Sequence, residues 1–146
     1  MKLKIAALLL VSALATAAAS LAAGGPIVEK PVATGNMLAT TIHGQTGGMV
    51  LDSIKIKPGG SFGWHTHSAP VAVVITGGTL TVFDPSVNKC APFKVSKGQS
   101  FVEPANHVHL ARNDGKATAT LYALYLGIPK GKPTDIPAGQ PAGCSA

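Results

Sequence analysis

Glycine and proline divide the chain after residue 23 into short runs of β-favouring residues, and this punctuation limits the folds open to it. The 146 residues include 17 glycines and 11 prolines, and both residue types interrupt helix interiors. No segment after Ala23 shows an apolar repeat of 3.6 residues with helix caps. The sequence therefore argues against a helical bundle and predicts one β-rich domain.

The runs between the turns are rich in Val, Ile and Thr, as strands are. Pro58-Gly59-Gly60 ends one run with turn-forming residues, and Gly77-Gly78 divides another into a hairpin-like pair of strands. About eight short strands result, which favours an antiparallel sandwich or barrel. The expected strand segments are residues 49–57, 70–83, 93–95, 100–103, 108–112 and 117–128.

Residues 1–23 have the pattern of a cleavable secretory signal peptide. Lys2 and Lys4 precede an apolar run of mostly Ala and Leu that ends in small residues. An uncleaved anchor helix is the alternative, although the alanine content makes a weak membrane span. We therefore expect a periplasmic or secreted protein without stable membrane insertion after cleavage.

The basic excess of the chain shrinks once this leader is set aside. The formal charge of +6 contains Lys2 and Lys4, so the remaining chain carries about +4. The other lysines are dispersed and have no interleaved aromatic residues. We therefore expect a solvated surface and no binding to nucleic acid.

The chain has two cysteines, Cys90 and Cys144, and both lie in the part expected to be exported. In an oxidising compartment such a pair is most simply a disulfide, which would tie the C-terminal tail to a mid-chain loop. Two thiolate metal ligands are the alternative, but the cysteines lack the short spacing of a zinc site.

Four of the five histidines form two His-x-His pairs, His65/His67 and His107/His109. Residues i and i+2 of a strand face the same side, so each pair presents two neighbouring imidazoles. Imidazoles from two strands can converge on one transition-metal ion. The alternative is that these histidines are surface or structural residues, and His43, which has no such partner, is expected to be structural.

Two longer motifs surround these histidines. Residues 59–78 read Gly-x5-His-x-His-x10-Gly, and residues 98–113 read Gly-x5-Pro-x4-His-x3-Asn. In spacing and order these motifs resemble those of the cupin superfamily. The resemblance covers about residues 35–128 and implies an all-β fold, an antiparallel double-stranded β-helix or jelly-roll barrel. On this division, residues 1–23 are the signal peptide, 24–34 an N-terminal arm and 129–146 a Pro/Gly-rich tail.

The resemblance implies that His65, His67 and His109 are metal ligands. The family also has a glutamate ligand four residues after the second histidine, and here that position is Val71, which cannot coordinate. Asn106 stands where the family usually has glycine, and asparagine tolerates the left-handed conformation that such a turn needs. We therefore expect a three-His variant of the site.

Two further residues are candidates for catalytic or supporting roles. Glu103 could approach the metal or orient His107 or His109, or it could be an exposed carboxylate on an edge strand. His107 could point into the barrel as an acid/base group or face solvent at the barrel mouth. A hydroxyl from Tyr122 or Tyr125 could also reach the pocket, although core packing is the simpler expectation for both.

Together these features predict an exported cupin that binds one divalent transition metal, with Fe2+ the first choice and Zn2+, Cu2+, Ni2+ or Mn2+ as alternatives. The leading hypothesis is a small metal-dependent enzyme of dioxygenase type acting on a small organic molecule. The alternatives are a non-catalytic metal- or ligand-binding module, and a lyase or isomerase that uses the metal as a Lewis acid. The resemblance also implies a homodimer.

Overall fold

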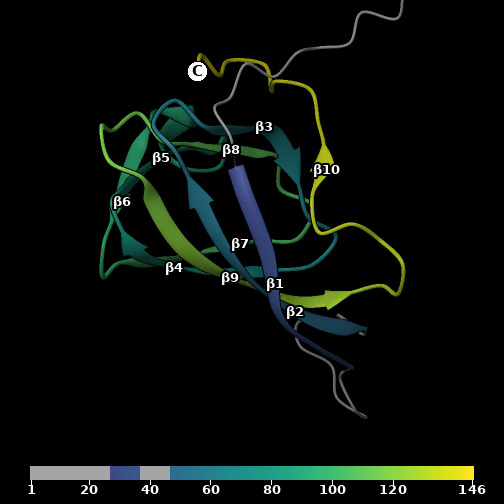
Figure 1. Ribbon diagram of the computed structural model, residues 1–146. Helices are drawn as coiled ribbons and strands as arrows, with labels where there is room; N and C mark the ends of the chain where they lie inside the picture. The colour runs from purple at the N-terminus through teal and green to yellow at the C-terminus, as the bar shows by residue number, and fades with distance from the viewer. Residues whose placement is uncertain (1–26, 37–46) are drawn as a thin grey trace, which may run out of the picture.

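A computed structural model describes residues 27–36 and 47–146 of the chain, and in this part the protein is built from antiparallel strands (Figure 1). The only helical segment of the described residues is a short 3-10 turn, η1 (Asn88–Cys90). The strands are β1 (Ile27–Asn36), β2 (Gly48–Ile56), β3 (Ser61–Thr66), β4 (Val71–Gly77), β5 (Thr79–Phe83), β6 (Phe93–Ser96), β7 (Ser100–Glu103), β8 (His109–Arg112), β9 (Ala119–Ile128) and β10 (Ile136–Pro137).

These strands form two five-stranded sheets that face each other. One sheet has the order β1-β2-β9-β4-β7 and the other β10-β3-β8-β5-β6, and Figure 1 shows β3, β5 and β8 across the barrel from β4, β7 and β9. Neighbouring strands pair in antiparallel fashion throughout. The predicted all-β, double-sheet barrel is therefore confirmed.

The core lies between the sheets because strand residues alternate between its two faces. In β9, Leu121, Ala123 and Tyr125 are buried, whereas Tyr122 between them is 44% exposed. Ile54 and Ile56 of β2 face the same interior. This alternation gives the barrel an apolar interior. An inward-facing polar group there needs a hydrogen-bond or charge partner, because burial without one is costly.

The prediction of a hairpin at Gly77-Gly78 is wrong. β4 pairs with β7 and β9, whereas β5 pairs with β6 and β8, so the two strands belong to different sheets. Gly78 lies at the corner with a φ of +68°, and a Cβ there would come within 2.8 Å of the Thr118 carbonyl oxygen. The glycines thus allow a sharp change of sheet and a close approach of two backbones.

The two ends of the described chain are more ordered than the sequence suggested. Residues 27–36, most of which fall in the expected N-terminal arm, form β1 and pair with β2. In the expected tail, β10 pairs with β3, and a disulfide joins Cys90 to Cys144 as predicted. Trp64 packs with this disulfide, Phe83 and Leu110 in a second apolar cluster.

Two predictions fall on residues outside the described part. They are the signal peptide over residues 1–23 and the structural role of His43. Within residues 27–36 and 47–146, no helix has the length and apolar character needed to cross a membrane.

Candidate metal centre

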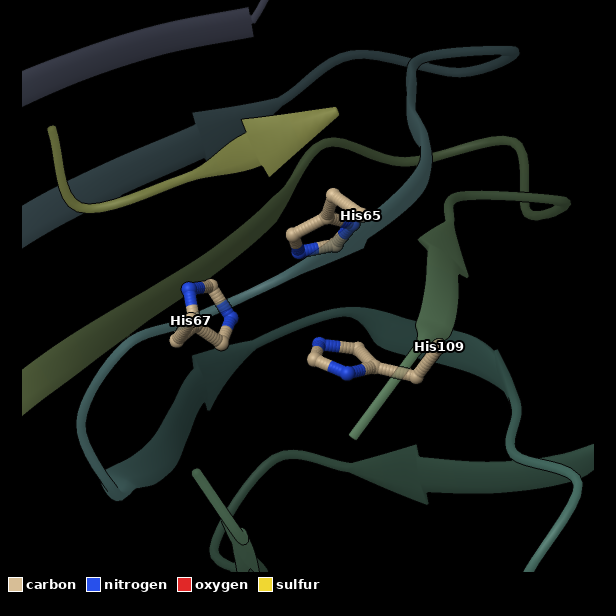
Figure 2. Close-up of side chains that lie close together, drawn as sticks. All are labelled: His65, His67 and His109. Carbon is tan, nitrogen blue, oxygen red and sulfur yellow. The ribbon is translucent and has the colours of Figure 1, made fainter. Parts of the chain in front are cut away.

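Two neighbouring strands bring the three predicted ligands together. β3 and β8 pair so that His65 lies directly opposite His109, and His67 follows two residues after His65 on the same face. All three side chains are buried, and one ligand nitrogen from each lies within 4.8 Å of the others. Figure 2 shows the rings of His65, His67 and His109 turned toward one shared space.

The turn before β8 fixes the position of His109 relative to β3. Asn106 has a φ of +61°, the left-handed conformation anticipated for this position. Its backbone N–H donates to the His67 carbonyl oxygen over 2.7 Å. The residue that replaces the usual glycine therefore ties the second motif to the first.

Each histidine ring is oriented by a hydrogen bond from its Nδ1 atom to a backbone carbonyl. His65 Nδ1 lies 3.0 Å from the Gly63 oxygen, His67 Nδ1 2.9 Å from the Thr134 oxygen, and His109 Nδ1 3.1 Å from the His107 oxygen. A carbonyl oxygen only accepts, so each Nδ1 carries a proton, and Nε2 is the nitrogen of each ring that remains for a metal ion. This is the arrangement that prepares imidazoles to bind a metal ion.

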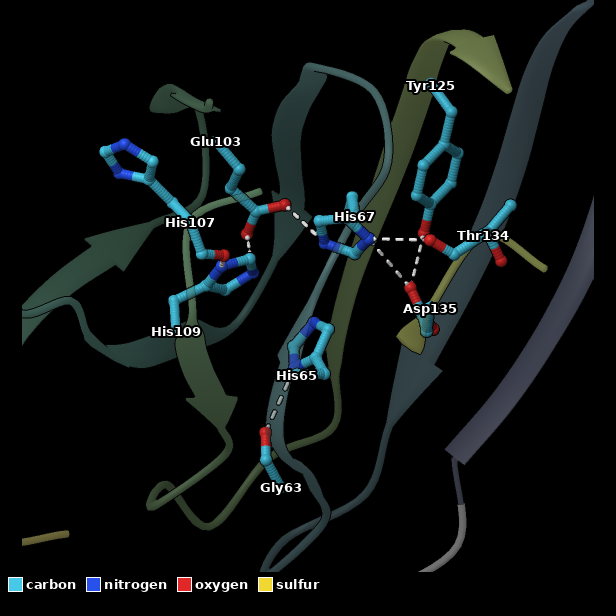
Figure 3. Close-up of polar contacts among 9 residues, drawn as sticks. All are labelled: Gly63, His65, His67, Glu103, His107, His109, Tyr125, Thr134 and Asp135. Atoms are coloured by element: carbon cyan, nitrogen blue, oxygen red, sulfur yellow. Dashed lines mark hydrogen bonds and ion pairs between the residues drawn. The ribbon is translucent and has the colours of Figure 1, made fainter. Parts of the chain in front are cut away.

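Glu103 is buried within the same cluster. Its two carboxylate oxygens lie 3.2 Å from His67 Nε2 and 3.1 Å from His109 Nε2. Neither Nε2 atom makes an aligned hydrogen bond, although both distances are short enough for one. Of the two placements considered for Glu103, the buried one beside the ligand cluster is therefore observed, and the exposed edge is not (Figure 3).

His107 and Val71 contribute no polar side-chain atom to the cluster. The His107 side chain is exposed and points away, while its carbonyl oxygen accepts from His109 Nδ1 (Figure 3). Val71 is buried with 1% exposure and faces the core. The position where the family has glutamate is therefore filled by apolar packing in this chain.

Two residues that sequence reasoning missed support His67 from the tail. The Thr134 carbonyl and the Asp135 carboxylate both face His67 Nδ1, the latter with Oδ1 at 3.1 Å. The Tyr125 hydroxyl lies 3.5 Å from the same Asp135 oxygen, so the structure brings one of the two candidate tyrosines to the site. Tyr122 faces solvent instead. No local pattern marks Thr134 or Asp135, because their contacts span more than 60 residues of sequence.

Burial and nearby charged groups shift the pKa values of the cluster. Burial, with the charge of nearby His109, lowers the pKa of His65 to about 4. Burial alone would lower the pKa of His67, but the carboxylates of Asp135 and Glu103 outweigh it and raise that pKa to about 10. Burial would raise the pKa of Glu103, but the rings of His109 and His67 lower it to about 2. Glu103 is therefore an anion at neutral pH, next to a site that attracts positive charge.

A small cavity adjoins the cluster inside the barrel. Its volume is about 30 Å³, which is space for about two water-sized molecules. Apolar side chains make up most of the wall, and the polar groups are His65, His67, Glu103, Tyr125 and Asp135. The space beside the cluster therefore offers a small molecule both apolar and polar contacts.

The donor set fits a divalent transition-metal ion. His67 Nε2 and His109 Nε2 are buried without an aligned hydrogen-bond partner, and buried polar atoms of this kind require an explanation. Imidazole nitrogens with Nδ1 already engaged bind Zn, Cu, Fe and Ni well, and a nearby carboxylate compensates part of the ion's charge.

Comparison with known proteins agrees with this picture. The sequence profile described as Cupin matches residues 35–126. A germin-like protein, subfamily 2 member 1, from Arabidopsis thaliana is 31% identical over 109 residues, which are 67% of this chain and 50% of that protein. The chain therefore spans about half the length of this curated relative.

Solved structures support the fold. A cupin domain from Bordetella pertussis superposes with a TM-score of 0.51 at 17% identity, over 70% of this chain and 94% of that one. The polyketide cyclase RemF from Streptomyces resistomycificus superposes with a TM-score of 0.52 at 17% identity, over 64% and 63% of the two chains. At these identities the likeness concerns the fold alone.

The fold and the site together define a small double-sheet β-barrel with a buried histidine cluster suited to a metal ion. The profile match covers more than half of the chain and includes all three histidines of the cluster. The chain belongs to the cupin family.

Proposed function

We propose that this protein binds one divalent transition-metal ion through His65, His67 and His109. The observation that carries the proposal is the convergence of the three rings: each Nδ1 faces a backbone carbonyl, and one ligand nitrogen from each ring lies within 4.8 Å of the others. The Nε2 atoms of His67 and His109 are buried and have no aligned hydrogen-bond partner, which leaves them available to an ion. Of the candidate metals, Fe2+ is the first choice on the resemblance to three-His cupins, with Zn2+, Cu2+, Ni2+ or Mn2+ as alternatives.

We further propose that the protein is a small metal-dependent enzyme of dioxygenase type that acts on a small organic substrate. An ion bound to the cluster would supply Lewis acidity and a binding position for substrate. The protein's own residues would orient the substrate and exclude water. The cavity of about 30 Å³ limits the part of the substrate that enters, and Phe62, Val73 and Phe101 give it apolar contacts.

A non-catalytic module that binds a metal or a small ligand is the second candidate. The narrowness of the cavity favours it, because a substrate and a co-reactant would both have to fit beside the cluster. Of the two catalytic candidates, Glu103 lines the cavity and His107 is exposed outside it.

The proposal is tested on full-length protein exported to a bacterial periplasm and purified without chelator. Metal analysis is expected to find about one equivalent of bound ion, and His65→Ala is expected to lose it. Less than half an equivalent, together with no effect of His65→Ala, would reject the metal site. The iron-loaded protein is then assayed for oxygen uptake with a panel of diketones, thiols and phenols, where no uptake with any of them favours the binding module.

We also propose that the protein is exported and that it forms a homodimer. The buried Cys90–Cys144 disulfide is of a kind that persists in oxidising compartments, which supports a periplasmic or secreted location. The expected partner is a small-molecule ligand or substrate. The homodimer stays a prediction from the resemblance, and light scattering of the purified protein would test it.

A further inference from the structure

The position of Glu103 is related to that of Val71 by the pairing of two strands. β4 and β7 run antiparallel, and their register places Val71 directly opposite Glu103. Directly opposed residues point to the same face of a sheet, with Cβ atoms about 5 Å apart. The family's glutamate position on β4 is Val71 in this chain. Glu103, on the neighbouring strand β7, thus directs a carboxylate into the same barrel interior.

The carboxylate of Glu103 uses both oxygens on the histidine cluster. One oxygen is 3.2 Å from His67 Nε2 and the other 3.1 Å from His109 Nε2. The residue is buried with 9% exposure. A buried carboxylate is stable only when a positive group compensates its charge, and here the groups that face it are the two nitrogens left free by their ring orientation.

The two contacts of Glu103 are short but are not aligned hydrogen bonds. Each Nδ1 faces a backbone carbonyl, so Nε2 is the nitrogen of each ring that faces a carboxylate oxygen. Neither Nε2 atom has an aligned hydrogen-bond partner. The two nitrogens and two oxygens are therefore arranged around a shared space, as ligand atoms around an ion are.

The observed separations are those of neighbouring ligands around one ion. With metal–ligand bonds of about 2.1 Å, two ligand atoms at right angles lie about 3.0 Å apart. The two nitrogen–oxygen distances, 3.1 and 3.2 Å, are close to this value. His65 offers a further nitrogen to the same group of converging atoms (Figure 2).

We propose that Glu103 is the fourth protein ligand of the metal, supplied by β7 in place of β4. The proposal rests on the metal site proposed above and makes it a three-His, one-carboxylate site. A divalent ion there would keep a net charge of +1 from its protein ligands, instead of the +2 left by three neutral histidines. The site would therefore hold the ion more tightly and attract added anions less.

The test compares four forms of the full-length protein: wild type, Glu103→Gln, the exchange variant with Val71→Glu and Glu103→Val, and Asp114→Asn. Glu103→Gln is close in shape and removes the charge, and the exchange moves the carboxylate across the strand pair. Asp114 is an exposed carboxylate that pairs with Arg112 outside the cluster, so its amide variant is the matched control. Circular dichroism confirms that each form is folded.

Two readouts that need no catalytic activity are measured. They are Co2+ affinity, by competition with a chromophoric chelator, and the visible spectrum of the Co2+-loaded protein, which reports the ligands of the ion. Supporting partners of metal ligands change affinity by about 10- to 100-fold. For a ligand we expect Glu103→Gln to lose more than about 100-fold and to change the Co2+ spectrum. The exchange variant recovers at least about tenfold of that loss, and Asp114→Asn behaves as wild type.

The outcomes separate this inference from the proposed metal site. If Glu103→Gln leaves the Co2+ spectrum unchanged while His65→Ala abolishes binding, Glu103 is not a ligand and the three-His site stands. If wild-type protein binds no Co2+, Fe2+ or Zn2+, both the site and the inference are rejected.

Discussion

His67 is the residue that joins the two halves of the candidate site. Its Nε2 faces Glu103 and its Nδ1 faces Thr134 and Asp135, so it contacts a barrel strand on one side and the tail on the other. An anionic partner on Nδ1 makes the imidazole a stronger electron donor at Nε2. The tail therefore influences how firmly His67 can hold an ion.

Replacing Asp135 by Asn tests this influence. The amide can still accept from His67 Nδ1 but has no charge, so we expect metal affinity to fall by about tenfold. Chelator competition measures the change, with Asp114→Asn as the control. An affinity equal to that of wild type would show that the Thr134 carbonyl alone orients the ring.

Glu29 on β1 predicts a pH dependence of stability. Although much of its side chain faces solvent, partial burial and the nearby Asp52 carboxylate raise the pKa of Glu29 from 4.5 to about 8. The folded protein thus holds this proton more tightly than the unfolded chain does. The contribution is complete below pH 4.5 and is lost as the pH rises toward 8.

We therefore expect wild-type Tm to fall more than that of Glu29→Gln between about pH 5 and pH 9. The neutral amide avoids the repulsion from Asp52, so the variant is relatively more stable at the alkaline end. Thermal melts of both proteins across this range, without added metal, give the measurement. Parallel curves for the two proteins would contradict the prediction.

At the scale of elements, β10 and its neighbouring residues fasten the strand that carries His65 and His67. β10 pairs Ile136 with Thr66 and Pro137 with His65, and the Ala138 N–H donates to the Trp64 carbonyl. The Cys90–Cys144 disulfide closes this segment against the barrel across 54 residues of sequence. The tail is thus a structural part of the second sheet.

Removing the disulfide should weaken both the fold and the site. For the double variant Cys90→Ser, Cys144→Ser, the chain-entropy estimate for a loop of this length is a loss of about 4 kcal/mol. Chemical denaturation measures this loss, and chelator competition shows whether metal affinity falls with it. A variant with wild-type stability and affinity would mean that β10 is held by its strand pairing alone.

At the scale of the whole molecule, metal binding should be coupled to folding, because the cluster joins β3 and β8 and exists only in the folded barrel. With free metal at about 100 times its Kd, the folded state gains about 2.7 kcal/mol. This corresponds to a rise in Tm of about 10 °C for a domain of this size. Calorimetry with and without a chelator measures the shift, and His65→Ala should show none.

The barrel fold and the grouping of the three histidines could be predicted because the spacing patterns that indicate them are local in sequence. A strand alternates every two residues wherever it lies, so His65 and His67 had to share a face. The same rules could not place Glu103, whose neighbours depend on the register between β4 and β7. The predicted hairpin at Gly77-Gly78 was wrong because a glycine pair suits a hairpin and a corner between sheets equally well.

Asp135 lay beyond these rules for a different reason. It follows the last long strand in a segment without periodicity, and its contact with His67 depends on how that segment folds back over β3. Only the complete three-dimensional packing brings the two residues together.

The position of the tail also sets an order of events in synthesis. Thr134, Asp135 and Cys144 all follow β9, so a ribosome makes them after the strands that carry the histidines. A chain that has not yet reached Thr134 holds all three histidines but lacks the carbonyl and the carboxylate that face His67 Nδ1. Synthesis must therefore pass residue 135 before His67 can be oriented as the structure shows.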